Sequence, residues 1–177
     1  MGWVISAPGG AASGAEGWVP VAAQEVVGAA AATVDLLDLD PHDLYKVVFE
    51  YQIDIQAADE QILVHFNGEI VGTNYSSLAW DSGGTQAQTA ANFMQLNRAI
   101  PSQLGWGVLE AVISNRAAVP KNLVGCLSMQ DAGRLGTFTG AWANVSTLID
   151  RITFSLENTS KFQVGSRAVV LGLTLDS

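Results

Sequence analysis

Apolar and polar residues alternate with a period of two along several segments of this chain, as expected of strands that bury one face. The clearest case is residues 44–56. One side of this segment carries Val47, Phe49, Tyr51, Ile53 and Ile55. Residues 61–67 alternate again after a short turn. Two alternating segments joined by a turn predict an antiparallel hairpin.

Alternation, or enrichment in β-branched and aromatic residues, predicts further strands. These cover residues 26–39, 75–80, 107–115, 123–130, 136–144, 148–156 and 167–175. Residues 85–96 are polar and alanine-rich and predict a long loop or a short helix. About eight strands at this spacing, with almost no helical periodicity, predict an all-β fold. We expect an antiparallel two-sheet sandwich, specifically a jelly roll.

The first 25 residues differ from the rest. They are rich in Gly, Ala and Pro and show no helical period. They predict an extended N-terminal arm, 1–25, ahead of a β-sandwich domain, 26–177. Trp3 and Trp18 would anchor the arm on a partner, since large aromatic side chains dominate interface energetics. The alternative is that this segment is a first edge strand of its own domain, and the sequence leaves both open.

Charged residues make up only 14% of the 177 residues, against about a quarter in ordinary soluble domains. This deficit predicts that much surface is buried against a sister subunit or another partner. The formal net charge is −9, and the 8 basic residues are scattered. Nucleic acid and anionic membranes both need clustered basic residues, so neither is an expected partner.

The single cysteine, Cys126, lies in the apolar run 123–127 and is expected to be a small buried side chain. A single cysteine without a recognisable export signal predicts synthesis in a reducing cytoplasm.

Catalytic chemistry has few candidates. The only histidines, His42 and His65, are not next to an obvious nucleophile, and no nucleophile-elbow or phosphate-loop motif is present. One turn region gathers potential metal ligands: Asp35, Asp38, Asp40, His42 and Asp43. Their spacing does not match a calcium loop, so we expect a solvated acidic turn. The sequence therefore predicts no catalytic, cofactor-binding or metal-binding residue. A glycan-cleaving enzyme with two facing carboxylates stays a rival hypothesis.

Aromatic residues offer one further possibility. Trp80, Trp106 and Trp142, with Tyr75, could stack on sugar rings, although tryptophans in β-domains more often serve the core. Trp80 and Trp142 are the candidates for glycan stacking.

Short motifs near the C-terminus carry a family resemblance. They are Gly136-Thr137-Phe138-Thr139-Gly140-Ala141-Trp142, Ile149-Asp150-Arg151-Ile152-Thr153-Phe154, Phe162-Gln163-Val164-Gly165-Ser166-Arg167-Ala168 and Leu171-Gly172-Leu173, preceded by Tyr45-Lys46-Val47-Val48-Phe49-Glu50-Tyr51. Together they resemble the β-sandwich virion proteins of tailed bacteriophages, which include head decoration proteins, head fibres and tail appendages. The similarity extends over about residues 30–175 in separate pieces, and Leu171 stands where Tyr is common.

The resemblance implies a structural or attachment role with no catalytic residues to carry over. We expect a capsid decoration protein that binds the major capsid protein or another virion protein. It would be made in the bacterial cytoplasm, assemble as a homotrimer and reside in the virion. The alternative is a tail or head fibre protein that attaches to a host-surface glycan.

Overall fold

The structure is a computed structural model that describes residues 17–54, 60–70, 73–81, 84–97, 105–129 and 134–175. Every regular element within these ranges is a β-strand. None of the described residues forms a helix long and apolar enough to cross a membrane.

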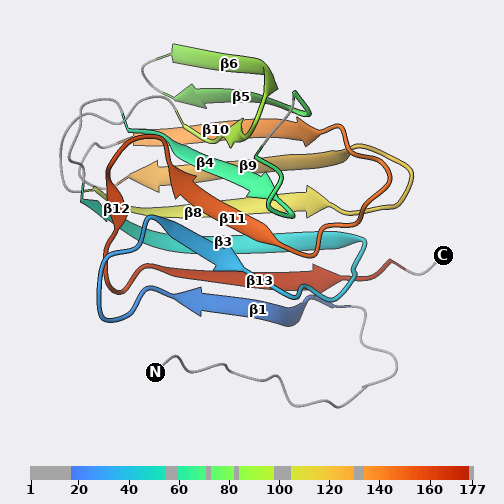
Figure 1. The fold of residues 1–177 in the computed structure, drawn as a ribbon, viewed down its shortest axis with the longest axis horizontal. Helices are drawn as coiled ribbons and strands as arrows, with labels where there is room; N and C mark the ends of the chain where they lie inside the picture. The colour runs from blue at the N-terminus through green and yellow to red at the C-terminus, as the bar shows by residue number, and fades with distance from the viewer. Residues whose placement is uncertain are drawn as a thin grey trace.

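The strands form two antiparallel sheets, with the smaller sheet lying across one face of the larger (Figure 1). The nine-stranded sheet runs β1 (Val19–Glu25), β13 (Arg167–Leu173), β3 (Leu44–Asp54), β8 (Gly105–Ser114), β9 (Lys121–Met129), β10 (Arg134–Trp142), β5 (Tyr75–Asp81) and β6 (Gly84–Ala91), with β12 (Lys161–Phe162) pairing to β3. The four-stranded sheet runs β2 (Thr33–Leu36), β11 (Ile152–Leu156), β4 (Ile62–Phe66) and β7 (Met94–Gln95). This confirms the predicted all-β, two-sheet sandwich. The finer assignment to a jelly roll stays a prediction.

The core lies between the sheets and is built on the predicted alternation of β3. The side chains of Val47, Phe49, Tyr51 and Ile53 are all 0% exposed. Phe49 contacts Phe154 of β11 in the opposite sheet, with ring centroids 4.9 Å apart. Because one aromatic side chain from each sheet meets here, this contact joins the two layers.

The predicted hairpin between residues 44–56 and 61–67 is wrong. The first segment is β3, in the large sheet, whereas the second is β4, in the small sheet between β11 and β7. Both edges of the 11-residue β3 are occupied by longer partners than the 5-residue β4, namely β8 and β13. Alternation identifies the buried face of a strand but not its neighbours.

Residues 85–96 were predicted as a loop or short helix and instead form β6 and β7. The strand β6 lies at the edge of the large sheet, and among the described strands it pairs only with β5. Its Thr, Gln and Ala residues therefore lack the strong apolar alternation of a central strand.

The arm predicted over residues 1–25 does not extend through its last part. Residues 19–25 form β1, which pairs with β13 from Val19↔Gly172 to Glu25↔Arg167. The alternative, a first edge strand, is correct for these residues, so the sandwich includes them. Trp3 lies outside the described residues. Trp18 directly precedes β1, and its side chain is 38% exposed.

Candidate binding surface

The outward side of the large sheet carries an unusual number of exposed apolar side chains over β8, β9, β10 and β5. The largest are Leu135 at 73% exposed, Val124 at 59% and Trp80 at 54%. We call this surface the outer apolar face. It comprises Val108, Val124, Cys126, Leu135, Thr137, Thr139, Leu78 and Trp80. A single exposed leucine is ordinary, but a contiguous apolar patch marks an interaction surface.

This face is also nearly uncharged. Among the outward side chains that the structure describes on β9, β10 and β5, none is acidic or basic. The nearest outward charge is Glu110 on β8, which pairs with Lys46 of β3 at 2.7 Å. A charge-depleted apolar centre is typical of surfaces that become buried against a partner.

A hollow of about 380 Å³ lies in this face. Two cross-strand rows, Glu110–Cys126–Thr137–Trp80 and Val108–Ser128–Leu135, form most of its lining. Small side chains occupy the middle of each row and larger ones the ends, which makes the surface concave. Neighbouring strands are roughly 4.8 Å apart, so Trp80 lies about 14 Å from the Glu110 position, three strands away.

Of the two tryptophans predicted to stack on sugars, only Trp80 presents an exposed ring. Trp142 is 1% exposed, and its Nε1 donates a hydrogen bond of 2.9 Å to Oε2 of Glu69. Its indole stacks on Tyr75, with centroids 6.2 Å apart and an interplanar angle of 10°. Trp142 is therefore a core residue in this structure.

The expectation that Cys126 is buried is wrong, because its side chain is exposed on the outer apolar face. Leu123 and Leu127 point into the core, so Val124 and Cys126 on the same strand point outward. Because residues 123–127 include no polar side chain, the sequence does not indicate which of them point outward.

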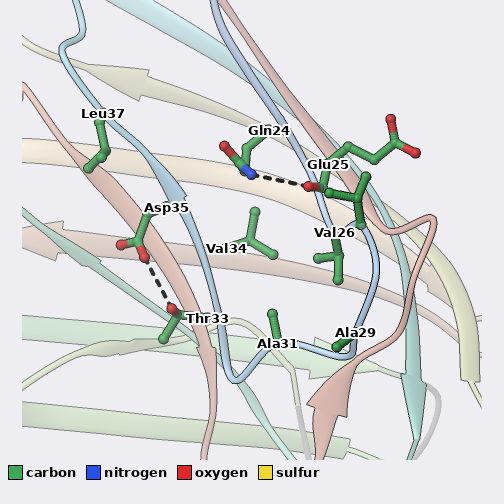
Figure 2. A pocket seen from close by; sticks show the side chains of 10 residues that line it. Gln24, Glu25, Val26, Ala29, Ala31, Thr33, Val34, Asp35 and Leu37 are labelled. Carbon is green, nitrogen blue, oxygen red and sulfur yellow. Dashed lines mark hydrogen bonds between the residues drawn. The ribbon is translucent and has the colours of Figure 1, made fainter. Parts of the chain in front are cut away.

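A second hollow, of about 310 Å³, lies between the end of β1 and β2 (Figure 2). Figure 2 shows an apolar bed of Val26, Ala31 and Val34, with Thr33 donating a hydrogen bond of 3.0 Å to the carboxylate of Asp35 at its rim. Its lining includes two carboxylates, those of Glu25 and Asp35, but no histidine, cysteine, lysine or serine. Two carboxylates in one hollow are what the glycan-cleaving alternative requires. Of the two, Asp35 is already held by Arg151, Thr153 and Thr33.

The potential metal ligands of the acidic turn, residues 35–43, do not converge on one point. The Asp35 carboxylate binds Arg151 Nη2 and Thr153 Oγ1, both at 2.6 Å. Burial alone would raise the pKa of Asp35, but hydrogen bonds from Thr153, Arg151 and Thr33 outweigh it and lower the pKa. Asp43 instead accepts from the backbone N–H of Leu175 at 2.8 Å. The described residues contain no group of three or more side chains able to hold a metal.

The histidines lie on different parts of the molecule. His65 is on β4, in a cross-strand row with Thr153 and Asp35. Burial lowers the pKa of His65, and the nearby Arg151 charge lowers it further.

The other histidine, His42, lies within hydrogen-bonding distance of the Thr174 hydroxyl, a contact that the sequence did not predict. His42 Nδ1 lies 3.0 Å from Thr174 Oγ1, in a hollow of about 300 Å³ that Arg116 also lines. No described carboxylate hydrogen-bonds the His42 ring, so the group that orients a catalytic histidine is lacking among the described residues.

The described acidic residues include one interacting pair, Glu60 and Glu157. Burial raises the pKa of Glu157, and the nearby Glu60 charge raises it further. Glu60 is fully buried, and its Oε1 accepts from the backbone N–H of Asn158 at 2.9 Å. Neither glutamate lines any of the three hollows described above.

Comparison with protein-family models, with curated proteins and with solved structures found no match to this chain. The physical character of the surface therefore carries the functional argument.

Proposed function

We propose that this protein is a non-enzymatic structural component of a bacteriophage virion, a capsid decoration protein that binds and stabilises the shell. The observation that carries the proposal is the outer apolar face, an exposed and nearly uncharged sheet surface with a concave centre. Leaving such a surface in water costs roughly 25 cal/mol per Å² of apolar area, which binding recovers.

Two further features support this function. The short motifs quoted above resemble those of β-sandwich virion proteins. The net charge of −9 fits a component on the outside of a particle better than one in contact with its genome. In this role the outer apolar face seats on the major capsid protein or another virion protein.

A decoration protein stabilises a shell by mass action, because it binds the assembled shell and not the dispersed subunits. The test uses shells assembled without this chain, from the major capsid protein of the same genome. Purified wild-type protein should bind them saturably and raise their melting temperature.

Matched variants locate the binding surface. Leu135→Asp places a charge in the outer apolar face, whereas Val145→Asp introduces the same charge at a 45% exposed valine in the β10–β11 connection. We expect Leu135→Asp to abolish shell binding and Val145→Asp to retain it, with both variants folded by circular dichroism. Equal binding by the two variants would contradict the use of this face.

A second candidate, attachment to a host-surface glycan, is favoured by one observation. The exposed Trp80 ring borders a hollow that also holds the hydroxyls of Ser128 and Thr137. Sugar recognition combines an aromatic platform with hydrogen-bonding groups of this kind. Binding to bacterial polysaccharide that disappears in Trp80→Ala, without any shell binding, would favour attachment over decoration.

A further inference from the structure

The two edges of the large sheet are built differently. At one edge, β1 contains Pro20, and its register with β13 shifts between Pro20 and Ala22. Proline and bulges are common devices that prevent an edge strand from pairing with another chain. At the other edge, the β5–β6 register also shifts, between Gln88 and Ala91, but β6 contains neither proline nor any charged residue.

The strand β6 has a vacant hydrogen-bonding side within the described part of the chain. Its only described strand partner is β5, and Figure 1 shows it as the outermost strand of the sheet. Its register with β5 is continuous from Gly84 to Gln88. A regular edge strand presents a row of unpaired backbone N–H and C=O groups that another strand can bind.

Five of the eight residues of β6 read the same in both directions. Residues 85–89 read Thr-Gln-Ala-Gln-Thr, a palindrome centred on Ala87. When two copies of such a strand pair antiparallel about a twofold axis at Ala87, every residue faces its own kind. Ala87 lies opposite Ala87, and Gln86 lies opposite Gln88. Threonine pairs and glutamine ladders of this type stabilise paired strands.

An unsatisfied polar group lies on the same strand. The side-chain oxygen of Gln88 is buried and has no hydrogen-bond partner in the described structure. Buried carboxamides normally have partners, because leaving one unpaired is costly. In the antiparallel arrangement the side chain of Gln86 from the second copy lies directly across from that of Gln88.

We propose that two copies of this chain associate by antiparallel pairing of their β6 strands about a twofold axis at Ala87. Ala87 pairs across β5 with Leu78, and Thr85 pairs with Trp80. The pairing therefore places the row Leu78–Ala87 of one copy end to end with the same row of the other. The outer apolar faces of both copies then form one continuous surface.

An isologous contact of this kind makes a dimer and closes after two subunits. It differs from the trimer that the family resemblance implies. The inference is independent of the proposed function, because it concerns the edge of the sheet and not what binds its face.

The test measures the mass of the full-length protein in solution by light scattering, over a range of concentrations. We expect a dimer of about 37 kDa, twice the 18.6 kDa of the chain. Ala87→Lys places two like charges opposite each other on the axis. It should raise the dimer dissociation constant at least about tenfold. The control, Ala23→Lys, makes the same change at an exposed position of the opposite edge strand β1 and should leave the dimer intact.

Cross-linking tests the register. In a Cys126→Ser background, Ala87→Cys should form a disulfide-linked dimer on mild oxidation, since directly opposed Cβ atoms are about 4.5–5.5 Å apart. Thr85→Cys should not, because its two copies would lie four residues apart along the strands, roughly 14 Å. A monomer at every concentration, a trimer, a dimer unaffected by Ala87→Lys, or equal cross-linking at both positions would overturn the proposal.

Discussion

The phenol ring of Tyr51 occupies the space in which a β-carbon of Gly107, on the neighbouring strand, would lie. The two residues are register partners in the β3–β8 pair. A β-carbon at position 107 would lie 2.4 Å from the Tyr51 ring and 2.5 Å from the backbone oxygen of Ser128. Glycine is required here because the buried tyrosine side chain occupies the space that any other residue would fill.

We therefore expect Gly107→Ala to lower the free energy of unfolding by about 1–3 kcal/mol, the usual cost of overpacking. The backbone oxygen cannot move away as a flexible side chain could. Gly17→Ala is the control, because nothing lies within 4 Å of a β-carbon built there. Its stability should be unchanged within about 0.5 kcal/mol. Urea unfolding of both variants checks this, and an equal effect would contradict the packing argument.

Removing the buried hydroxyl should change the free energy of unfolding in opposite directions at two tyrosines, Tyr51 and Tyr75. The Tyr51 hydroxyl has no hydrogen-bond partner in the described structure. The Tyr75 hydroxyl accepts from the backbone N–H of Phe66 at 2.9 Å. Tyr51→Phe should raise the free energy of unfolding by about 1 kcal/mol, because it removes an unsatisfied buried group. Tyr75→Phe should lower it by a similar amount, and chemical unfolding should separate the two; a loss in both would show that Tyr51 is bonded in solution.

High pH should destabilise the fold through Tyr75. Burial raises the pKa of Tyr75 to about 12, so the folded state holds the phenol proton more tightly than the unfolded chain does. This contribution is complete below pH 10 and is lost as the pH rises from 10 towards 12. Tyr75→Phe should show a shallower decline of unfolding free energy above pH 10 than the wild type. Parallel declines would place the alkaline transition elsewhere.

Mild acid should destabilise the fold through His65. Burial and the Arg151 charge lower the pKa of His65 from 6.5 in the folded state. Below pH 6.5 the unfolded chain therefore binds a proton that the folded protein excludes, and stability falls by at most about 1.4 kcal/mol per pH unit. His65→Gln should flatten this slope between pH 6.5 and 5, a range above the ordinary value of 3.8 for Asp35. An unchanged slope in urea titrations would exclude His65 as its source.

The thiol of Cys126 reports on the occupancy of the outer apolar face. It is exposed and lines the hollow, so it should react with iodoacetamide in the free protein. Binding to a shell should slow alkylation at least about tenfold. Pairing through β6 alone should leave the rate unchanged, because β6 is three strands away, roughly 14 Å. Protection in the isolated dimer would mean that the face itself mediates self-association.

The sequence alone determined that the chain is all-β and where most strands lie. It also identified the buried face of β3, since Val47, Phe49, Tyr51 and Ile53 alternate with more polar residues. This signal is local: a strand that buries one face must place apolar side chains at every second position. Low charge also predicted a buried surface, although it did not locate one.

The tertiary structure decided which strands are neighbours and which apolar residues face outward. Pairing of β3 with β8 and β13, rather than with β4, depends on contacts between residues far apart in the chain. Val124 and Cys126 point outward because Leu123 and Leu127, on the other side of the same strand, lie in the core. Where both faces of a strand are apolar, the pattern no longer distinguishes them, and only the position of the second sheet settles which side is buried.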